Sequence, residues 1–174
     1  MTSIVTDPPG ASRRSYIAHE TGISIVINMA ISAAFVWIVF GGAAAVPVSG
    51  TRGLLVDFLP QTFMIALMGS LVPSALTRKR LRGHRRQGQP GRGEIAGGAP
   101  FLPWLPRSLL VRSILIALAA LPILASPAML LLWSVQHAPV TIWVVLVLKI
   151  AYGALVAAVV TPLAVRAVLG ETGE

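Results

Sequence analysis

One lysine, Lys149, lies inside a long apolar stretch and is the first candidate for chemistry. A charged side chain in hydrocarbon is expensive, so a cation there needs a partner, a water-filled cleft or a route for its ammonium to the surface. Asp57 and Gln61 lie one helical turn apart near the start of another apolar stretch. We expect Asp57, Gln61 and Lys149 to meet, either as a structural ion pair or as a pocket for a polar or anionic ligand.

Residues suited to other chemistry are missing or scattered. The chain has no cysteine, which excludes a thiolate nucleophile and a cysteine-ligated iron–sulfur cluster. Its 3 histidines, His19, His84 and His137, fall in separate polar segments and offer neither a haem clamp nor a metal triad. No nucleophile elbow, phosphate loop or facing carboxylate pair is present, and no acid lies deep in an apolar stretch. The sequence predicts a protein without catalytic activity, metal, cofactor or proton coupling.

The composition indicates that these candidates lie in a lipid environment. Of 174 residues, 55 % are hydrophobic and only 11 % are charged, and the mean hydropathy is +0.79. A soluble domain with so little charge could not cover its own surface. The apolar residues also form runs of about twenty or more, which match a hydrocarbon core of about 30 Å at about 1.5 Å per helical residue. The predicted fold class is therefore all-α and integral to a membrane.

Four apolar runs predict four transmembrane helices, arranged as two helical hairpins. The predicted spans cover residues of about 23–42, 54–76, 109–133 and 140–165. We expect a cytoplasmic tail at 1–22, a transmembrane domain at 23–170 and a short acidic tail at 171–174. Pro122 and Pro127 predict kinks in the third span, because each removes a backbone donor and clashes with the preceding turn.

The basic residues predict the orientation. Of the 14 lysines and arginines, all but Arg52 and Lys149 fall in the N-terminal tail, in or beside the connection 77–108, or after the fourth span. Cytoplasmic loops carry an excess of such residues, so both termini and the connection 77–108 are expected in the cytoplasm. Six cations are expected to contact anionic lipid headgroups, at about 1 kcal/mol each. They are Arg78, Lys79, Arg80, Arg82, Arg85 and Arg86.

The same basic connection has two other interpretations. It could recognise a cytoplasmic protein partner. Nucleic acid is not an expected partner, because a surface that follows phosphates would interleave aromatic side chains with the cations, and the aromatics Phe101 and Trp104 come only after the basic run.

A competing interpretation makes the first span a cleaved signal. Arg13 and Arg14 precede it, and the small residues 43–45 resemble a cleavage site. The apolar stretch is, however, longer than the roughly 7–15 residues of a signal core and contains bulky aromatic residues. We therefore expect the first span to be retained.

Two polar residues of the first span receive structural interpretations. Glu20 precedes the predicted span, where a helix N-terminus favours an anion. Asn28 lies inside the span and is expected to serve packing between helices.

The Ala/Gly/Arg-rich composition is typical of high-GC bacteria, and four spans around a basic central connection resemble the layout of small four-span proteins of unassigned function in bacterial inner membranes. The resemblance implies a structural or accessory component of the bacterial cytoplasmic membrane, as a homo-oligomer or with another membrane protein. The alternative is a small permease that binds a polar or anionic ligand near Lys149.

Overall fold

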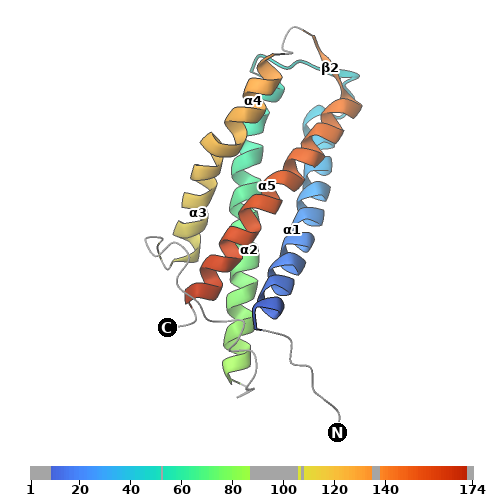
Figure 1. Ribbon diagram of the computed structural model, residues 1–174. Coiled ribbons are helices and arrows are strands. Elements are labelled where there is room, and N and C mark those ends of the chain that lie inside the picture. Colours follow the sequence, from blue (N-terminus) through green and yellow to red (C-terminus); the bar gives the residue numbers. More distant parts are fainter. Residues whose placement is uncertain (1–8, 52, 87–105, 107, 135–137, 172–174) are drawn as a thin grey trace.

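The computed structural model describes residues 9–51, 53–86, 106, 108–134 and 138–171. Within these residues the chain forms four long helical segments (Figure 1). They are α1 (Pro9–Phe40), α2 (Leu54–Arg86), a third segment made of α3 (Leu109–Ala120), η1 (Leu121–Ala125) and α4 (Ser126–Trp133), and α5 (Ile142–Glu171). Each of the four is long and apolar enough to cross a membrane, as the sequence predicts.

Three helices extend beyond their predicted spans. α1 begins at Pro9, although a tail was expected up to residue 22, and α2 continues to Arg86 into the predicted connection. α5 continues to Glu171, beyond the predicted end near residue 165. Proline suits the first helical position, because its missing N–H has no partner there anyway. Residues 77–86 are rich in the helix formers Leu, Lys and Arg and contain no proline. The rest of the connection up to residue 105, and both chain ends, lie outside the described residues.

The third span is interrupted close to where its prolines predicted a disturbance. Leu121–Ala125 forms a π-helical turn with Pro122 in it, between the two α-helical pieces. A proline inside a helix removes one backbone hydrogen-bond donor. A π turn is one way in which the helix accommodates the missing hydrogen bond. Pro127 lies in the first turn of α4, directly after this π turn.

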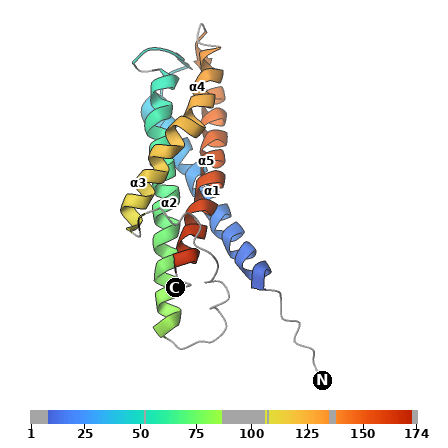
Figure 2. The same cartoon turned by 60° about the vertical axis from the view of Figure 1, so that its left-hand side comes forward.

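Helix α5 occupies the centre of the bundle. It packs against α1 on one side and α2 on the other, and α2 in turn packs against α3 (Figures 1 and 2). α1 therefore contacts α5 far more than it contacts α2, the next helix in the sequence. The start of α1 and the end of α5 lie at the same end of the bundle, here named the terminal end.

Rows of residues four apart face each other where α1 meets α5. The buried row of α1 contains Glu20, Ser24, Asn28, Ser32, Val36 and Phe40. The buried row of α5 contains Val145, Lys149, Gly153, Ala157, Thr161, Val165 and Leu169. Rows with this spacing pack into each other when the axes cross at about 50°. Figure 2 shows the two helices inclined to each other and diverging toward the start of α1.

The two helices approach each other closely at Gly153. A Cβ atom at this position would collide with the Ser32 side chain and would lie 3.4 Å from the carbonyl oxygen of Asn28. Small residues permit such close backbone approach, which in lipid supplies much of the packing energy between helices. Glycine at this position thus sets the distance between α1 and α5.

The opposite end, here named the ribbon end, is closed by a short two-stranded ribbon. β1 (Ala45–Val46) and β2 (Val140–Thr141) pair antiparallel, with Ala45 opposite Thr141 and Val46 opposite Val140. Val46 of β1 and the neighbouring Val48 are each 1 % exposed. These strands were not predicted, because two residues are too few to show an alternating pattern.

Replacing Gly153 with leucine should force α1 and α5 apart. Overpacking a close contact typically costs about 1–3 kcal/mol, so the melting temperature of the protein in detergent should fall. Ala151→Leu is the matched control, because Ala151 is an exposed residue of the same helix, and its melting temperature should stay near that of the unmodified protein. Equal melting temperatures for the two variants would contradict the close contact.

Candidate functional site

The three residues singled out from the sequence meet near the ribbon end. Lys149 Nζ on α5 forms an ion pair with Asp57 Oδ2 on α2. Gln61 Nε2 donates to the Lys149 carbonyl oxygen at 3.5 Å and to Ser32 Oγ on α1 at 3.3 Å. These contacts join three helices at one point. A role of the cluster in ligand binding stays a prediction.

Protein groups surround the ammonium of Lys149. Its side chain is only 2 % exposed, against 23 % for that of Asp57. The ammonium nitrogen lies 5.6 Å from the ring centre of Phe40 and 5.3 Å from that of Phe58. A carboxylate and two aromatic faces are the groups that best replace the hydration of a buried cation. The charge of Lys149 is therefore balanced inside the bundle.

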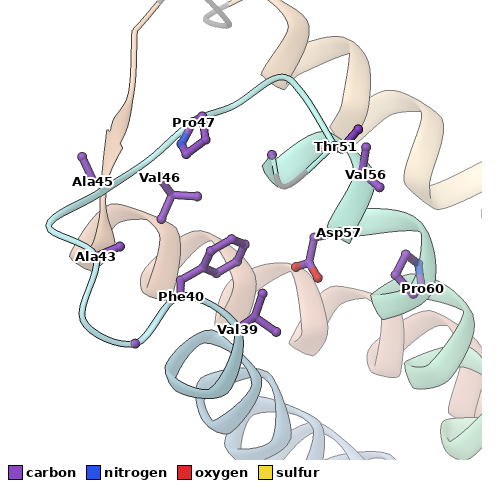
Figure 3. A pocket seen from close by; sticks show the side chains of 12 residues that line it. Val39, Phe40, Ala43, Ala45, Val46, Pro47, Thr51, Val56, Asp57 and Pro60 are labelled. Atoms are coloured by element: carbon purple, nitrogen blue, oxygen red, sulfur yellow. The ribbon is translucent and has the colours of Figure 1, made fainter.

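A cavity of about 640 Å³ lies beside the ion pair (Figure 3). The end of α1, the α1–α2 connection and the first turns of α2 form its walls. Asp57 and Thr51 are the two polar side chains of the lining, and Lys149 is not part of it. Of the three residues of the predicted pocket, Asp57 alone lines this cavity, and neither Gln61 nor Lys149 is part of the lining. The carboxylate therefore faces the open space, whereas the ammonium does not.

Buried polar side chains continue from this cluster along the α1–α5 contact. We name the buried Glu20, Ser24, Asn28, Ser32, Lys149 and Thr161, together with the half-buried Gln61 of α2, the polar seam. Asn28 Nδ2 donates to the Ser24 carbonyl oxygen at 2.8 Å, within its own helix. Thr161 Oγ1 on α5 lies 2.8 Å from Ser24 Oγ and 3.1 Å from the Gly69 carbonyl oxygen on α2. The seam therefore links α1, α2 and α5 again near the middle of the bundle.

Other buried hydroxyl groups link α2 and α5 beside the seam. Thr62 Oγ1 lies 2.6 Å from Tyr152 Oη, and Ser74 Oγ donates to the Ala164 carbonyl oxygen at 3.5 Å. The Tyr152 ring packs on Phe58 at 4.7 Å between centres, so the ring that faces Lys149 is itself held in place. Gln61 Oε1, in contrast, is buried without a hydrogen-bond partner among the described residues.

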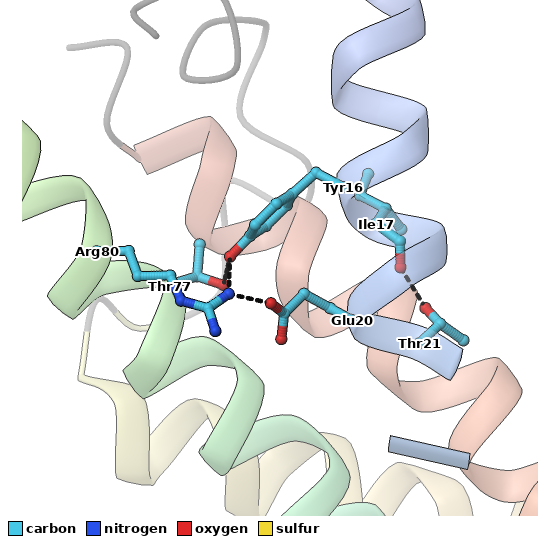
Figure 4. Close-up of polar contacts among 6 residues, drawn as sticks. All are labelled: Tyr16, Ile17, Glu20, Thr21, Thr77 and Arg80. Carbon is cyan, nitrogen blue, oxygen red and sulfur yellow. Dashed lines mark hydrogen bonds and ion pairs between the residues drawn. The ribbon is translucent and has the colours of Figure 1, made fainter. Parts of the chain in front are cut away.

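A second ion pair lies at the terminal end of the seam (Figure 4). Arg80 on α2 pairs with Glu20 on α1, and Tyr16 Oη lies 3.0 Å from Thr77 Oγ1 and accepts from Arg80 at 3.4 Å. The Glu20 side chain is 4 % exposed and that of Arg80 is 50 % exposed.

This geometry corrects the interpretation of Glu20. It does not cap a helix start, because α1 begins at Pro9 and Glu20 lies about 16 Å further along the axis at 1.5 Å per residue. It is instead a buried acid near the terminal end of a helix that could cross a membrane.

The six predicted headgroup cations all lie on α2, within its extension. Arg78 is half-buried, whereas Lys79 and Arg80 are exposed. Arg82, Arg85 and Arg86 continue the same helix to its last residue. Because Arg80 also pairs with Glu20, it holds α1 to α2 while half of its side chain stays accessible. Lipid contact of the six cations stays a prediction.

Several buried polar residues of this bundle were not predicted from the sequence. Ser24 and Ser32 are two of them, although Glu20, Ser24, Asn28 and Ser32 repeat at intervals of four and so mark one helix face. Arg112 was assigned to the basic flank of the third span, yet it lies inside α3 and is 1 % exposed. Its place inside a predicted apolar span was the available signal.

Metal binding finds no support in this site. Among the residues that the structure describes, no group of three or more His, Asp or Glu side chains could hold a metal ion.

The class that these features define is a multi-pass membrane protein, built from four helices of spanning length among the described residues. Comparisons of the chain with protein-family models, with curated proteins and with solved structures found no match.

Thr161→Val should weaken the bundle, because it removes the hydroxyl between Ser24 and Gly69 while keeping the side-chain shape. Hydrogen bonds between membrane helices contribute about 0.6–2 kcal/mol, so the free energy of unfolding in detergent should fall by that amount. Thr161→Ser keeps the hydroxyl and should lose less. An equal free energy of unfolding for Thr161→Val and the unmodified protein would show that the hydroxyl does not link the helices.

Proposed function

We propose that this chain is a small polytopic membrane protein without catalytic activity, which acts as a structural or accessory component of the bacterial inner membrane. Both termini and the basic connection lie on the cytoplasmic side in this proposal, against anionic lipid. Its partners are a second copy of the chain or another membrane protein. The distribution of basic residues along the sequence supports the orientation, since only Arg52 lies in a connection at the ribbon end.

The enclosure of Lys149 carries the functional part of this proposal. A lysine that bound a substrate would present its ammonium to a cleft, but this side chain is 2 % exposed and paired with Asp57. The pair instead connects α2 and α5, the two helices in the centre of the bundle. An internal clamp suits a protein whose role depends on its shape and assembly.

Removing one member of the ion pair should destabilise the protein more than removing both. A buried pair that loses one partner typically costs about 3–5 kcal/mol, whereas replacing both partners is often close to neutral. Asp57→Asn should cost more than Lys149→Met, because it leaves the more enclosed charge unpaired. The double variant should recover stability in thermal unfolding. An unchanged melting temperature for Lys149→Met would contradict the clamp.

The runner-up function is a small permease, and the polar seam is the observation that favours it. Polar groups run from the Asp57–Lys149 pair at the ribbon end to the Glu20–Arg80 pair at the terminal end. The Lys149→Met variant separates the two functions. Lost stability alone fits the clamp, whereas stabilisation by phosphate or a small carboxylate that disappears in a still-folded variant fits the permease.

Single cysteines should report the proposed orientation, because the natural chain has none. Ser49 and Lys79 are exposed and lie toward opposite ends of α2. A membrane-impermeant maleimide should label Ser49→Cys on intact cells and should label Lys79→Cys only after the cells are opened. Reversed labelling would overturn the orientation.

A further inference from the structure

We propose that the cavity beside Asp57 is a binding site for an amphiphilic cation, such as a quaternary ammonium or phosphonium group on an apolar body. The site goes beyond the accessory role proposed above and requires neither transport nor catalysis. Its volume of about 640 Å³ falls in the range of small-molecule sites, which is roughly 300–1,000 Å³.

The lining of the cavity selects for an apolar body. Its side chains come mainly from valine, alanine, proline and phenylalanine, and Figure 3 shows Phe40, Val39 and Pro60 around the Asp57 carboxylate. Such a wall gains from burying hydrocarbon but offers few hydrogen bonds. A strongly hydrated ligand, such as a free amino acid, would lose its water there without replacement.

The charges at the cavity select for a positive group. Asp57 is the one ionisable side chain of the lining, and the described walls contain no basic residue. Asp57 Oδ2 pairs with Lys149, but an ionised carboxylate has two oxygens and about four acceptor positions. Its 23 % exposed side chain can therefore meet a second cation, while an anion would face the carboxylate with the ammonium of Lys149 out of reach.

The position of the cavity gives such a ligand a way in. Three residues that line the cavity are also exposed on the outside of α1 and α2: Val39, Val56 and Pro60. Other exposed apolar side chains lie beside them on both helices. An amphiphilic cation concentrates at the boundary between headgroups and acyl chains, close to where this end of the bundle lies in a membrane. It can thus enter sideways from the bilayer.

The Asp57–Lys149 pair makes the affinity adjustable. In the natural chain the ligand shares the carboxylate with the ammonium of Lys149. Removing that ammonium frees the carboxylate for the ligand, whereas removing both charges leaves an apolar cavity. The two changes therefore have opposite effects on the binding of a cation.

Tetraphenylphosphonium and tetraphenylborate test the site, since they have nearly the same shape and opposite charge. Equilibrium binding to the full chain in lipid nanodiscs, corrected with empty nanodiscs, should show saturable binding of the phosphonium and none of the borate. Lys149→Met should tighten phosphonium binding by about tenfold, which corresponds to 1.4 kcal/mol. The double variant Asp57→Asn with Lys149→Met should lose it.

Ala43→Trp supplies a variant that keeps both charges. Ala43 lines the cavity and is exposed, so a tryptophan there should fill the space and abolish phosphonium binding at an unchanged melting temperature. The site would be overturned by saturable binding of both probes, by none of the phosphonium, or by unchanged binding in Ala43→Trp. These outcomes are independent of the clamp, which is judged by the stability of Lys149→Met.

Discussion

Polar side chains in hydrocarbon must find their partners within the protein, and this constraint decides which helices of this bundle meet. Lipid tails are as apolar as leucine, so two membrane helices gain little from pressing apolar faces together. Close backbone contact and hydrogen bonds distinguish one pairing from another. α1 carries a row of polar residues at intervals of four, and α5 offers Gly153 and Thr161 at the same intervals. α1 therefore packs on α5 although α2 follows it in the chain.

The charged groups occupy the two ends of this contact. Lys149 pairs with Asp57 near the ribbon end, and Glu20 pairs with Arg80 near the terminal end, so each pair fixes α2 to one of the other two helices. Hydroxyl and amide groups, which are less costly to bury than charges, lie between them. The short ribbon, with the buried Val46 and Val48, closes the ribbon end of the bundle. The ammonium of Lys149 is enclosed, whereas the Asp57 carboxylate faces the cavity that the α1–α2 connection helps to form.

Hydropathy was enough to predict the four helices, because the thickness of a bilayer sets the length of an apolar run. The meeting of Asp57 with Lys149 also followed from the sequence, since a cation in hydrocarbon needs a partner and Asp57 lies near the start of another apolar stretch. The start of α1 at Pro9 and the end of α2 at Arg86 did not follow from the sequence. Hydropathy reports the apolar part of a helix and not the polar turns that extend it. The choice of α5 as partner of α1 depends on contacts at single residues such as Gly153, which no average over a span can show.

Burial also decides which charged group of the ion pair a ligand would meet. From the sequence, Lys149 looked like the group that would touch a ligand, because it lies deeper in its span than Asp57 does in its own. In the folded chain that depth encloses the ammonium, and the shallower carboxylate reaches the cavity. A buried ion pair is not required for stability, because a well-packed apolar pair of similar volume often serves equally well. Stability alone therefore does not explain an ion pair at this place. A second role for one of its two residues explains it better, and Asp57 is the residue that faces the cavity.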